Sequence, residues 1–430
     1  MKIPSVKGFR DVLPGESARW AALEGRARDV FAAYNFHEIR LPIVERTELF
    51  RRSIGETTDI VEKEMYTFTD RDGTSLTLRP EGTASAVRAY VESALYQSET
   101  VSKLFYFGPM FRRERPQRGR LRQFYQIGVE VFGRDDAAAD AEVLTLLYDL
   151  LHAFGIDGAE VQVNSLGCRD CRPAYRAALV EWGRKHLSAL CEDCRRRLDQ
   201  NPLRLLDCKN PSCIALRDSA PRMSEYWCDA CRAHHGRVLE LLRAVGLEPH
   251  QQPYMVRGLD YYCRTAFEVL ASGLGAQNAV GGGGRYDGLV RDLGGPDVAG
   301  VGFALGVERL AMLLGESPTV TASPEFIVLP IGERAEAVAA TLARRWRLSG
   351  ARIELEPSGK SLKSQMRRAD KLGGRYALIL GDDELAADAL SVRDLEARCD
   401  YPRAVRLEAP LAELRATLDE IKLTSAERHA

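Results

Sequence analysis

Six arginines crowd one eleven-residue segment of the chain. They are Arg112, Arg113, Arg115, Arg118, Arg120 and Arg122, with Glu114 as the acid among them. Cations packed this densely repel one another unless an anion lies between them. Guanidinium groups are planar and permanently charged, so they suit phosphate. We predict contact with phosphate or nucleic acid here, in preference to the alternative of a solvated loop.

Three further segments combine arginine with tyrosine or glycine. Residues 257–262 read Arg-Gly-Leu-Asp-Tyr-Tyr and would suit a small polar ligand, although core tyrosines would give the same pattern. Gly281–Gly284 would let a ligand approach the backbone, although a flexible turn fits equally well. This run matches neither a P-loop nor a dinucleotide fingerprint. Residues 300–309 predict a glycine-punctuated strand entering a helix, whose Arg309 could simply pair with a carboxylate.

Eight of the ten cysteines occur as four pairs within a short part of the chain. The pairs are Cys168 and Cys171, Cys191 and Cys194, Cys208 and Cys213, and Cys228 and Cys231. Four thiolates bind Zn²⁺ tetrahedrally, so this spacing favours one or two structural zinc ions over ordinary buried thiols. We expect 191/194 to join 208/213 and 168/171 to join 228/231, although spacing alone does not decide the pairing.

Hydrophobic periodicity places these residues on predicted elements. Helices are expected at 16–35, 83–93 and 138–154, strands at 40–45 and 76–79, and a hairpin at 103–133. The arginine-rich segment is then the hairpin loop. Beyond a linker at 316–324, strands at 326–330, 352–356 and 376–380 alternate with helices at 333–348 and 360–372. That alternation predicts a small α/β domain with a mostly parallel sheet.

Bulk properties restrict the class of protein. A length of 430 residues predicts two or three domains. The net charge of −1 means that a nucleic-acid partner would need local basic patches. We find no signal peptide and no run of eighteen apolar residues, and we therefore expect a cytoplasmic protein without a membrane segment. Thiols stay reduced there, which favours metal ligands over disulfides.

The order of the motifs resembles the class II aminoacyl-tRNA synthetases. The resemblance rests on Leu41-Pro42, Arg79-Pro80-Glu81-Gly82-Thr83, Phe111-Arg112-Arg113-Glu114 and the segment from Gly302 to Arg309. Residues 257–262, residues 283–289 and the start Lys7-Gly8-Phe9-Arg10-Asp11 are similar to segments of the histidyl-tRNA synthetase family. The resemblance spans nearly the whole chain. The cysteine pairs depart from it, since the insertion domain of that family need not carry them.

The resemblance implies an α+β fold. Its catalytic core would be an antiparallel sheet flanked by helices, formed by residues 1–166 and 249–316. A Cys-rich helical module at 167–248 would interrupt that core. A linker at 317–324 and an α/β anticodon-binding domain at 325–430 would follow.

The resemblance also implies the reaction: L-histidine and ATP form histidyl-adenylate and pyrophosphate, and histidine then passes to the 3′ end of its tRNA. Arg112, Arg257 and Arg309 would be catalytic, because two anions must meet. The implied ATP site is Arg112, Glu114, Arg120 and Arg309, with Mg²⁺ on the phosphates. The implied histidine site is Glu81, Thr83, Gln126, Glu130, Arg257, Tyr261, Tyr262 and Tyr286. Within it, Glu81, Thr83 and Gln126 would hold the α-amino group, and Glu130 and Tyr262 would contact the two imidazole nitrogens.

Contacts with tRNA are implied at two places. The hairpin loop would offer Arg115, Gln117, Arg118 and Arg120 to the acceptor stem. The helix at 360–372 carries a basic stripe that includes Lys363 and Arg367, opposite an apolar stripe. A homodimer with an interface near Pro42 is also implied. The rival hypothesis is an inactive synthetase-like regulatory subunit of ATP phosphoribosyltransferase, in which we expect eroded motifs and no anticodon domain.

Overall fold

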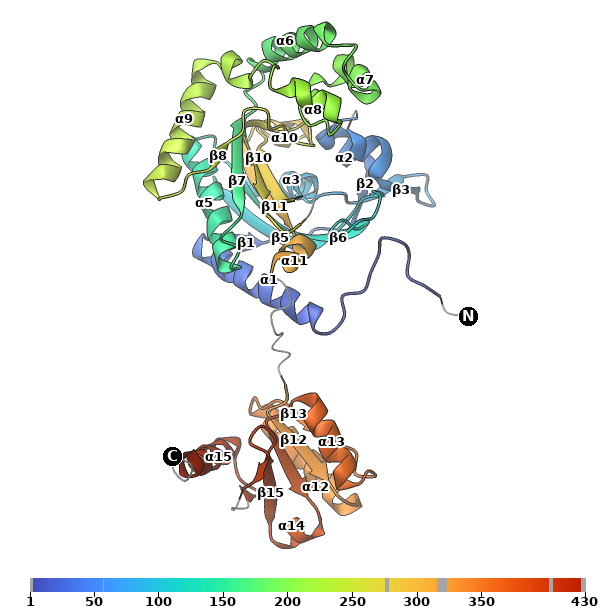
Figure 1. Cartoon of the computed structure of the whole chain (residues 1–430), viewed down its shortest axis with the longest axis vertical. Coiled ribbons are helices and arrows are strands. Elements are labelled where there is room, and N and C mark those ends of the chain that lie inside the picture. Colours follow the sequence, from blue (N-terminus) through green and yellow to red (C-terminus); the bar gives the residue numbers. More distant parts are fainter. Residues whose placement is uncertain (1–2, 57, 275–277, 315–322, 402–404, 427–430) are drawn as a thin grey trace. The chain divides into compact units, whose positions relative to one another are not determined.

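The computed structural model describes residues 3–56, 58–274, 278–314, 323–401 and 405–426. The chain divides into two compact units, Met1–Ser317 and Pro318–Ala430 (Figure 1). Most of the predicted linker at 316–324 lies outside the described residues. Among the residues described, helices are too short or too polar to cross a bilayer.

An eight-stranded sheet forms the centre of the first unit. Its order is β1 (His37–Glu38), β5 (Ser102–Phe111), β6 (Gln123–Phe132), β11 (Gly300–Gly306), β10 (Ala279–Arg285), β9 (Cys263–Leu270), β7 (Glu160–Ser165) and β8 (His250–Gln251). Pairing is antiparallel except at the two edges, where β1–β5 and β7–β8 are parallel. The predicted antiparallel core and the predicted hairpin, now β5–β6, are confirmed.

Side-chain alternation gives this sheet one packing face and one polar face. On β6, Ile127, Val129 and Val131 are buried in the main hydrophobic core. Helices α1 (Glu16–Ala33), α5 (Ala137–Ala153) and α9 (Asp229–Ala244) supply the other side of that core. Successive strand residues point to opposite faces, so Gln126 and Glu130 lie on the other face.

The polar face is bordered by α3 (Thr83–Glu92), α2 (Thr47–Ile54) and a three-stranded sheet. That sheet has the order β2 (Val44–Arg46), β4 (Ser75–Leu78) and β3 (Tyr66–Thr69). The strand expected at 40–45 was wrong in its extent, because β2 begins only at Val44. Short elements complete the unit: η1 (Ile60–Glu64), α4 (Leu95–Ser98), α10 (Leu289–Asp292) and α11 (Val307–Leu313).

The glycine run is a central strand, which excludes the flexible turn considered above. Gly281–Gly284 belong to β10, which pairs with β9 on one side and β11 on the other. A Cβ on Gly282 would lie 2.9 Å from the Arg257 guanidinium. Glycine is required because side chains and backbone approach this strand closely on the polar face.

A buried ion pair ties this strand to the helical layer. Arg285 is fully buried and lies 2.9 Å from Asp140 on α5. Asp140 also accepts a hydrogen bond from Thr265 (3.1 Å) and pairs with His234 on α9. Periodicity gave no indication of this network, whose members come from four separate segments.

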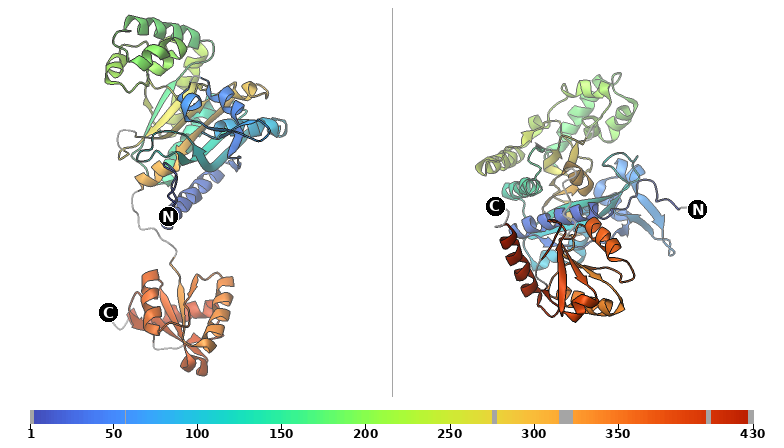
Figure 2. Two further views of the ribbon diagram at one scale, coloured as in Figure 1. Left: turned by 90° about the vertical axis from the view of Figure 1, so that its right-hand side faces the viewer. Right: turned by 60° about the horizontal axis from the view of Figure 1, so that its bottom comes forward.

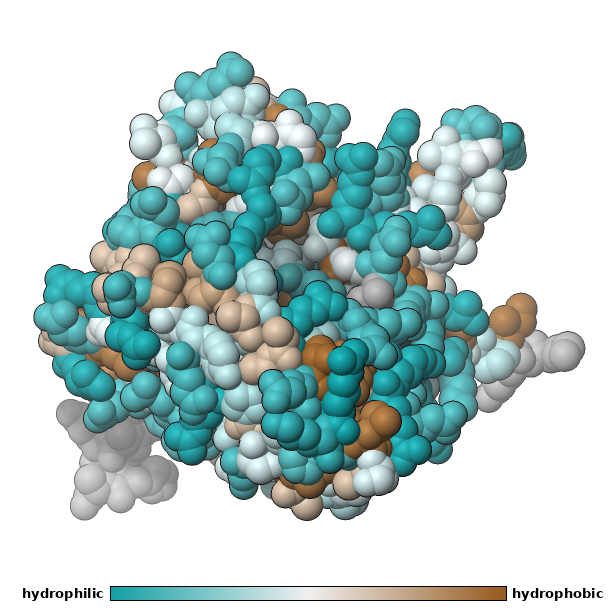
Figure 3. Space-filling model, turned by 90° about the horizontal axis from the view of Figure 1, so that it is seen from above, coloured by the Kyte–Doolittle hydropathy of each residue, from teal (hydrophilic) through white to brown (hydrophobic). Residues whose placement is uncertain are grey.

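The insertion module is a small helical layer with its own core. It comprises α6 (Arg172–Lys185), α7 (Glu192–Gln200), η2 (Pro202–Leu205), α8 (Pro211–Arg217), η3 (Met223–Tyr226) and the start of α9. Helices α6, α7 and α8 gather at one end of the unit (Figure 2). The surface seen from that end is mostly hydrophilic (Figure 3). The module's core contains the eight paired cysteines, either buried or packed against it.

The second unit is an α/β domain with a mixed sheet. Its order is β13 (Ile353–Leu355), β12 (Phe326–Pro330), β14 (Tyr376–Leu380), β15 (Ala389–Asp394) and β16 (Cys399–Asp400), with β17 (Val405–Arg406) also on β15. Helices α12 (Glu333–Leu348), α13 (Leu362–Leu372), α14 (Asp382–Ala386) and α15 (Leu411–Ala426) accompany it. The expectation of a mostly parallel sheet was wrong: β12 pairs in parallel with β13 and β14, but every pairing of β15 is antiparallel.

Candidate active site

A cavity of about 620 Å³ lies on the polar face of the eight-stranded sheet. Arg112, Arg257 and Arg309 all line it, although they come from a hairpin, an irregular segment and a helix. Burial lowers the pKa of Arg112, and the neighbouring Arg257 cation adds to that effect. Three cations therefore converge on one hollow, as an enzyme that joins two anions requires.

Each of these arginines is held by carbonyls or carboxylates at the rim of the cavity. Arg112 Nε donates to the Pro80 carbonyl (2.8 Å), and Arg257 Nη1 pairs with Glu268 (2.9 Å). Arg309 donates to the carbonyls of Gly119 (3.2 Å) and Ala279. Such contacts fix the direction of each guanidinium, and the carbonyl contacts do so without adding a negative charge.

The arginine-rich loop divides into an inward and an outward set. Arg120 lines the cavity and forms an ion pair with Glu114, which is buried there as well. Arg115, Gln117 and Arg118 are exposed. The loop begins where β5 ends, beside the cavity. Its middle, residues 115–118, is largely exposed to solvent, and Arg120 near its end lines the cavity again.

A polar pocket adjoins the arginines. Glu81, Thr83, Gln126, Tyr261 and Tyr262 line the same cavity. Within the described residues, Gln126 Oε1, Arg257 Nε and the Tyr261 hydroxyl are buried without a hydrogen-bond partner. Buried polar atoms usually have partners, so three orphans around one cavity indicate a ligand that supplies them.

Two predicted residues lie behind the wall of this pocket. Glu130 is fully buried and accepts hydrogen bonds from Thr83 (2.7 Å), Tyr286 (2.5 Å) and Tyr106 (3.2 Å). Neither Glu130 nor Tyr286 belongs to the cavity lining. Glu81 lines the cavity, but its carboxylate also accepts from the first backbone N–H groups of α3, at Thr83 (2.7 Å) and Ala84 (2.9 Å).

Comparison with known proteins identifies the family. The sequence profile of histidyl-tRNA synthetase matches residues 8–310, and that of the anticodon binding domain matches residues 325–418. The chain belongs to the histidyl-tRNA synthetase family. A histidine–tRNA ligase from Trichlorobacter lovleyi is 53% identical over 95% of this chain and 97% of its own length. The crystal structure of apo histidyl-tRNA synthetase from S. aureus is 33% identical, has a TM-score of 0.79, and covers 95% of this chain and 98% of its own.

A more distant structure shares the fold alone. It is described as an ATP phosphoribosyltransferase regulatory subunit/histidyl-tRNA synthetase from Bacillus halodurans. It is 22% identical with a TM-score of 0.63, and the match covers 86% of this chain and 97% of that one. The fold is therefore common to both hypotheses, and the site residues must distinguish them.

The two cysteine clusters of this synthetase have the geometry of metal sites. Cys168, Cys171, Cys228 and Cys231 form one cluster and Cys191, Cys194, Cys208 and Cys213 the other, each with all sulfurs within 4.8 Å. The predicted pairing is confirmed. Sγ–Sγ distances such as Cys171–Cys231 (3.6 Å) and Cys191–Cys208 (3.8 Å) match the separation of about 3.8 Å that four sulfurs at 2.3 Å around Zn²⁺ require. They are far too long for disulfides.

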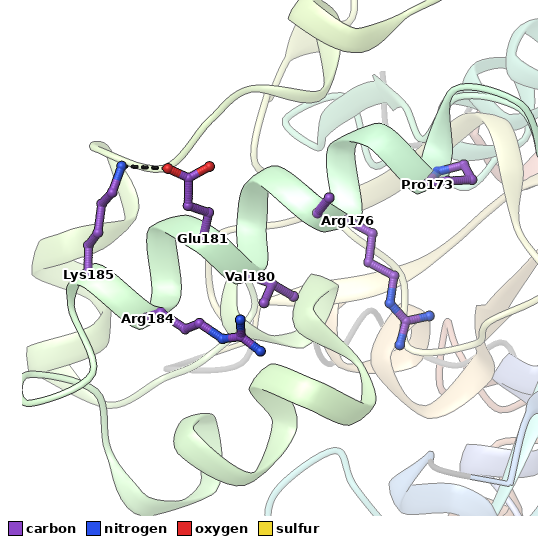
Figure 4. A pocket seen from close by; sticks show the side chains of 7 residues that line it. Pro173, Arg176, Val180, Glu181, Arg184 and Lys185 are labelled. Carbon is purple, nitrogen blue, oxygen red and sulfur yellow. Dashed lines mark hydrogen bonds and ion pairs between the residues drawn. The ribbon is translucent and has the colours of Figure 1, made fainter.

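A shallow hollow runs along the outer side of α6. Figure 4 shows Arg176 and Arg184 projecting to one side of this helix, beside Val180, and Lys185 paired with Glu181 (2.7 Å) on the other. The lining lacks the orphaned buried atoms of the main cavity. The hollow therefore suits a charged surface more than a small molecule.

Several residues of the site were not predicted. Tyr106 supports Glu130, Glu268 holds Arg257, and Asp207 and Lys209 of the insertion module reach the main cavity. Glu268 carried a usable signal, since it is an isolated carboxylate in an otherwise buried strand. Asp207 and Lys209 carried none, because only the fold of the module brings them to the site.

Burial of Glu130 predicts a pH effect on stability. Desolvation raises the pKa of Glu130 from 4.5 to about 8, so the folded chain keeps a proton that the unfolded chain has lost above pH ~4.5. The free energy of unfolding should therefore fall as the pH rises toward 8, with a contribution from this group on the order of a few kcal/mol. Glu130→Gln should lack this contribution and show a shallower decline, measured by denaturant unfolding at pH 5–8.5. The exposed Glu99→Gln should follow wild type, and parallel profiles for Glu130→Gln and wild type would contradict the expectation.

Proposed function

We propose that this synthetase is a histidine–tRNA ligase that uses ATP. In the first step a histidine carboxylate oxygen attacks the α-phosphorus of ATP, the bond to pyrophosphate breaks, and histidyl-adenylate forms. In the second step a terminal ribose hydroxyl of tRNA attacks the histidyl carbonyl and AMP leaves. The observation that carries this proposal is the convergence of Arg112, Arg257 and Arg309 on one cavity.

The arginines divide the phosphate chemistry among them. Arg112 would hold the α-phosphate, and Arg309 the γ-phosphate end, with Arg120 and Glu114 beside them. Arg257 would bridge the α-phosphate and the histidine carboxylate, because its guanidinium neighbours that of Arg112 and lies 5.9 Å from the centre of the Tyr262 ring. Mg²⁺ would enter with the triphosphate on its β- and γ-phosphates. Positioning and charge then supply most of the catalysis.

The orphaned atoms suggest how histidine is held. Gln126 Oε1 is an unsatisfied acceptor and suits the α-ammonium group, together with Glu81 and Thr83. The Tyr261 hydroxyl and Tyr262 line the side where the imidazole would lie. Contact between the imidazole and Glu130 would require Thr83 or Tyr286 to give up its hydrogen bond to that carboxyl group. A pocket that satisfies both ring nitrogens rejects apolar amino acids, because they would leave its polar groups unpaired.

The regulatory-subunit hypothesis is disfavoured by the same residues. All three arginines of the motifs are present and face the cavity. The second unit, which matches the anticodon binding domain, is present as well. A purely regulatory chain would need neither feature.

Replacing Arg257 should separate catalysis from ATP binding. Wild type should support histidine-dependent exchange between ATP and pyrophosphate. Arg257→Ala should lower the exchange rate about a hundredfold or more, since it removes a cation where two anions meet, and should change the KM for ATP by less than about threefold. Near-normal exchange in the variant would refute the assigned role. Failure of wild type to catalyse any histidine-dependent exchange would refute the function.

Three basic surfaces are proposed to hold tRNA. The outward residues of the hairpin loop, Arg115, Gln117 and Arg118, and the basic side of α6 would meet the acceptor arm. In the second unit, Lys363 and Arg367 are exposed on α13, while Ala369 of the same helix is buried. This face would contact the anticodon stem.

Reversing charge on α13 should affect tRNA without affecting adenylation. The double substitution Lys363→Glu and Arg367→Glu should raise the KM for tRNA by roughly tenfold, because phosphate contacts are lost. Histidine-dependent pyrophosphate exchange should stay unchanged. Arg398→Glu, an exposed reversal elsewhere in the unit, serves as control. Equal loss of both activities in the double variant would contradict a role confined to tRNA.

We also propose a homodimer in the cytoplasm, where ATP and tRNA are available. Ile43 and Val44, which follow Pro42 in the chain, and Phe68 on β3 are large apolar residues exposed on or beside the three-stranded sheet. A subunit interface would remove such side chains from water. Their position agrees with the interface implied by the family resemblance.

Both cysteine clusters are proposed to hold structural Zn²⁺. Purified wild type should contain about two zinc ions per chain, measured by atomic emission. Cys208→Ser and Cys228→Ser should each lose about one ion, since each removes a ligand from a different cluster. The exposed Cys399→Ser, which belongs to neither cluster, should retain both. Less than one zinc per wild-type chain would reject the proposal.

A further inference from the structure

The segment that carries Arg257, Tyr261 and Tyr262 is a thin wall between two cavities. Residues 252–262 run between β8 and β9 as turns and irregular chain. The main cavity lies on one side. A second cavity of about 520 Å³ lies on the other, between this segment and the α6 and η2 helices of the insertion module. Both cavities are lined by Arg257 and Tyr262. An irregular segment has no sheet or helix ladder to fix it, so its polar groups need partners from elsewhere.

The insertion module supplies those partners at alternate residues of the segment. Arg204 donates to the Gly258 carbonyl. Asn201 Nδ2 donates to the Asp260 carboxylate at 3.0 and 3.3 Å. Arg172 donates to the carbonyl of Tyr262.

The core holds mainly the start of the segment. Asn164 on β7 donates to the carbonyls of Pro253 (3.2 Å) and Met255 (3.0 Å). Further along, the Asp260 N–H donates to the Ile54 carbonyl (3.2 Å), and Arg257 pairs with Glu268 on β9 (2.9 Å). Within the ligand-bearing part, 257–262, side chains of the module therefore hold Gly258, the Asp260 carboxylate and Tyr262, while the core holds Arg257 and the Asp260 N–H.

Each of the three anchors lies in chain that a cysteine cluster constrains. Arg172 directly follows Cys171, a member of the first cluster. Asn201 and Arg204 lie between Cys194 and Cys208, both members of the second. The helix η2, which carries Arg204, has four residues and is too short to be stable by itself. The direction of these side chains therefore depends on the closed clusters.

We infer that the insertion module positions the histidine-binding segment through Arg172, Asn201 and Arg204, so that the two Cys₄ metal sites support amino-acid activation before any tRNA binds. This inference rests on the function proposed above. The ATP side is held differently: Arg112 and Arg309 bond to carbonyls of Pro80, Gly119 and Ala279, all outside the module. Loss of an anchor should therefore weaken histidine binding selectively.

Pyrophosphate exchange without tRNA tests this selectivity. Arg204→Met and Asn201→Ala should each raise the KM for histidine about tenfold, the effect of losing one hydrogen bond, with the KM for ATP within about twofold of wild type. Arg204→Lys, which can still donate, should recover part of the loss. Arg195→Met is the matched control, because Arg195 donates to the carbonyls of Leu187, Ser188 and Leu190 within the module and should leave both KM values unchanged.

Metal removal gives a second measurement that does not depend on a substitution. Stripping zinc from wild type with a chelator should raise the KM for histidine, and added Zn²⁺ should restore it. Stripping should raise it less in Arg204→Met, since two changes that act through one contact are not additive. Circular dichroism and zinc content report whether each variant is folded.

The outcomes separate this inference from the proposed function. Suppose that wild type catalyses exchange but the KM for histidine is unchanged in Arg204→Met and Asn201→Ala. That result would overturn the positioning role and leave the proposed function intact. Equal rises in both KM values, or the same change in Arg195→Met, would show a merely structural module and overturn it too. Absence of histidine-dependent exchange in wild type would instead overturn the function.

Discussion

The site depends on holding several half-buried guanidinium groups together before their anions arrive. Burial lowers the pKa values of Arg112, Arg120 and Arg309, which shows that each cation is removed from water at a cost. Their mutual repulsion opposes the arrangement further. Neutral carbonyls hold Arg112 and Arg309, while Glu114 and Glu268 form ion pairs with Arg120 and Arg257. The site is thereby preorganised, because the charge stands in place before the reaction and need not be reoriented during it.

The eight-stranded sheet makes this arrangement possible because its apolar side chains lie on one face and its polar side chains on the other. Residues of β6, β9, β10 and β11 alternate between the helical core and the cavity, so the rigid core fixes the direction of the polar side chains. Glycine creates the space they need. A Cβ on Gly302 would lie 2.1 Å from a Glu130 oxygen, and one on Gly128 would lie 2.2 Å from the Tyr106 ring. The glycine-rich strands thus serve to fit buried carboxyl and phenol groups against the sheet.

The insertion module adds a second level of support. In the catalytic unit, the sheet orients Gln126 and Glu268, and the module orients the irregular segment opposite them. A small module with a limited hydrophobic core would gain stability from the Zn²⁺ proposed at the two cysteine clusters. The same metal sites would then stabilise the module and hold the histidine-binding segment in position.

The sequence by itself determined the motifs, the hairpin and the cysteine pairs. These are local features, carried by residue types at short spacing, and motif order was sufficient to indicate the family. Hydrophobic periodicity also predicted the long helices α1, α5 and α12 and several strands, including the β5–β6 hairpin. It could not place Gly281–Gly284 in a strand, because glycine carries no hydrophobic signal, and it could not foresee the antiparallel half of the second sheet, because strand direction depends on how the chain returns.

Only the tertiary structure decided which distant side chains meet. The Arg285–Asp140 pair joins residues 145 positions apart, and Arg204 reaches Gly258 across 54. It also placed Glu130 behind the cavity wall, whereas the family resemblance implied a direct contact with the imidazole. Spacing along the chain describes one element at a time. Contacts between elements depend on packing, which a single sequence encodes only collectively.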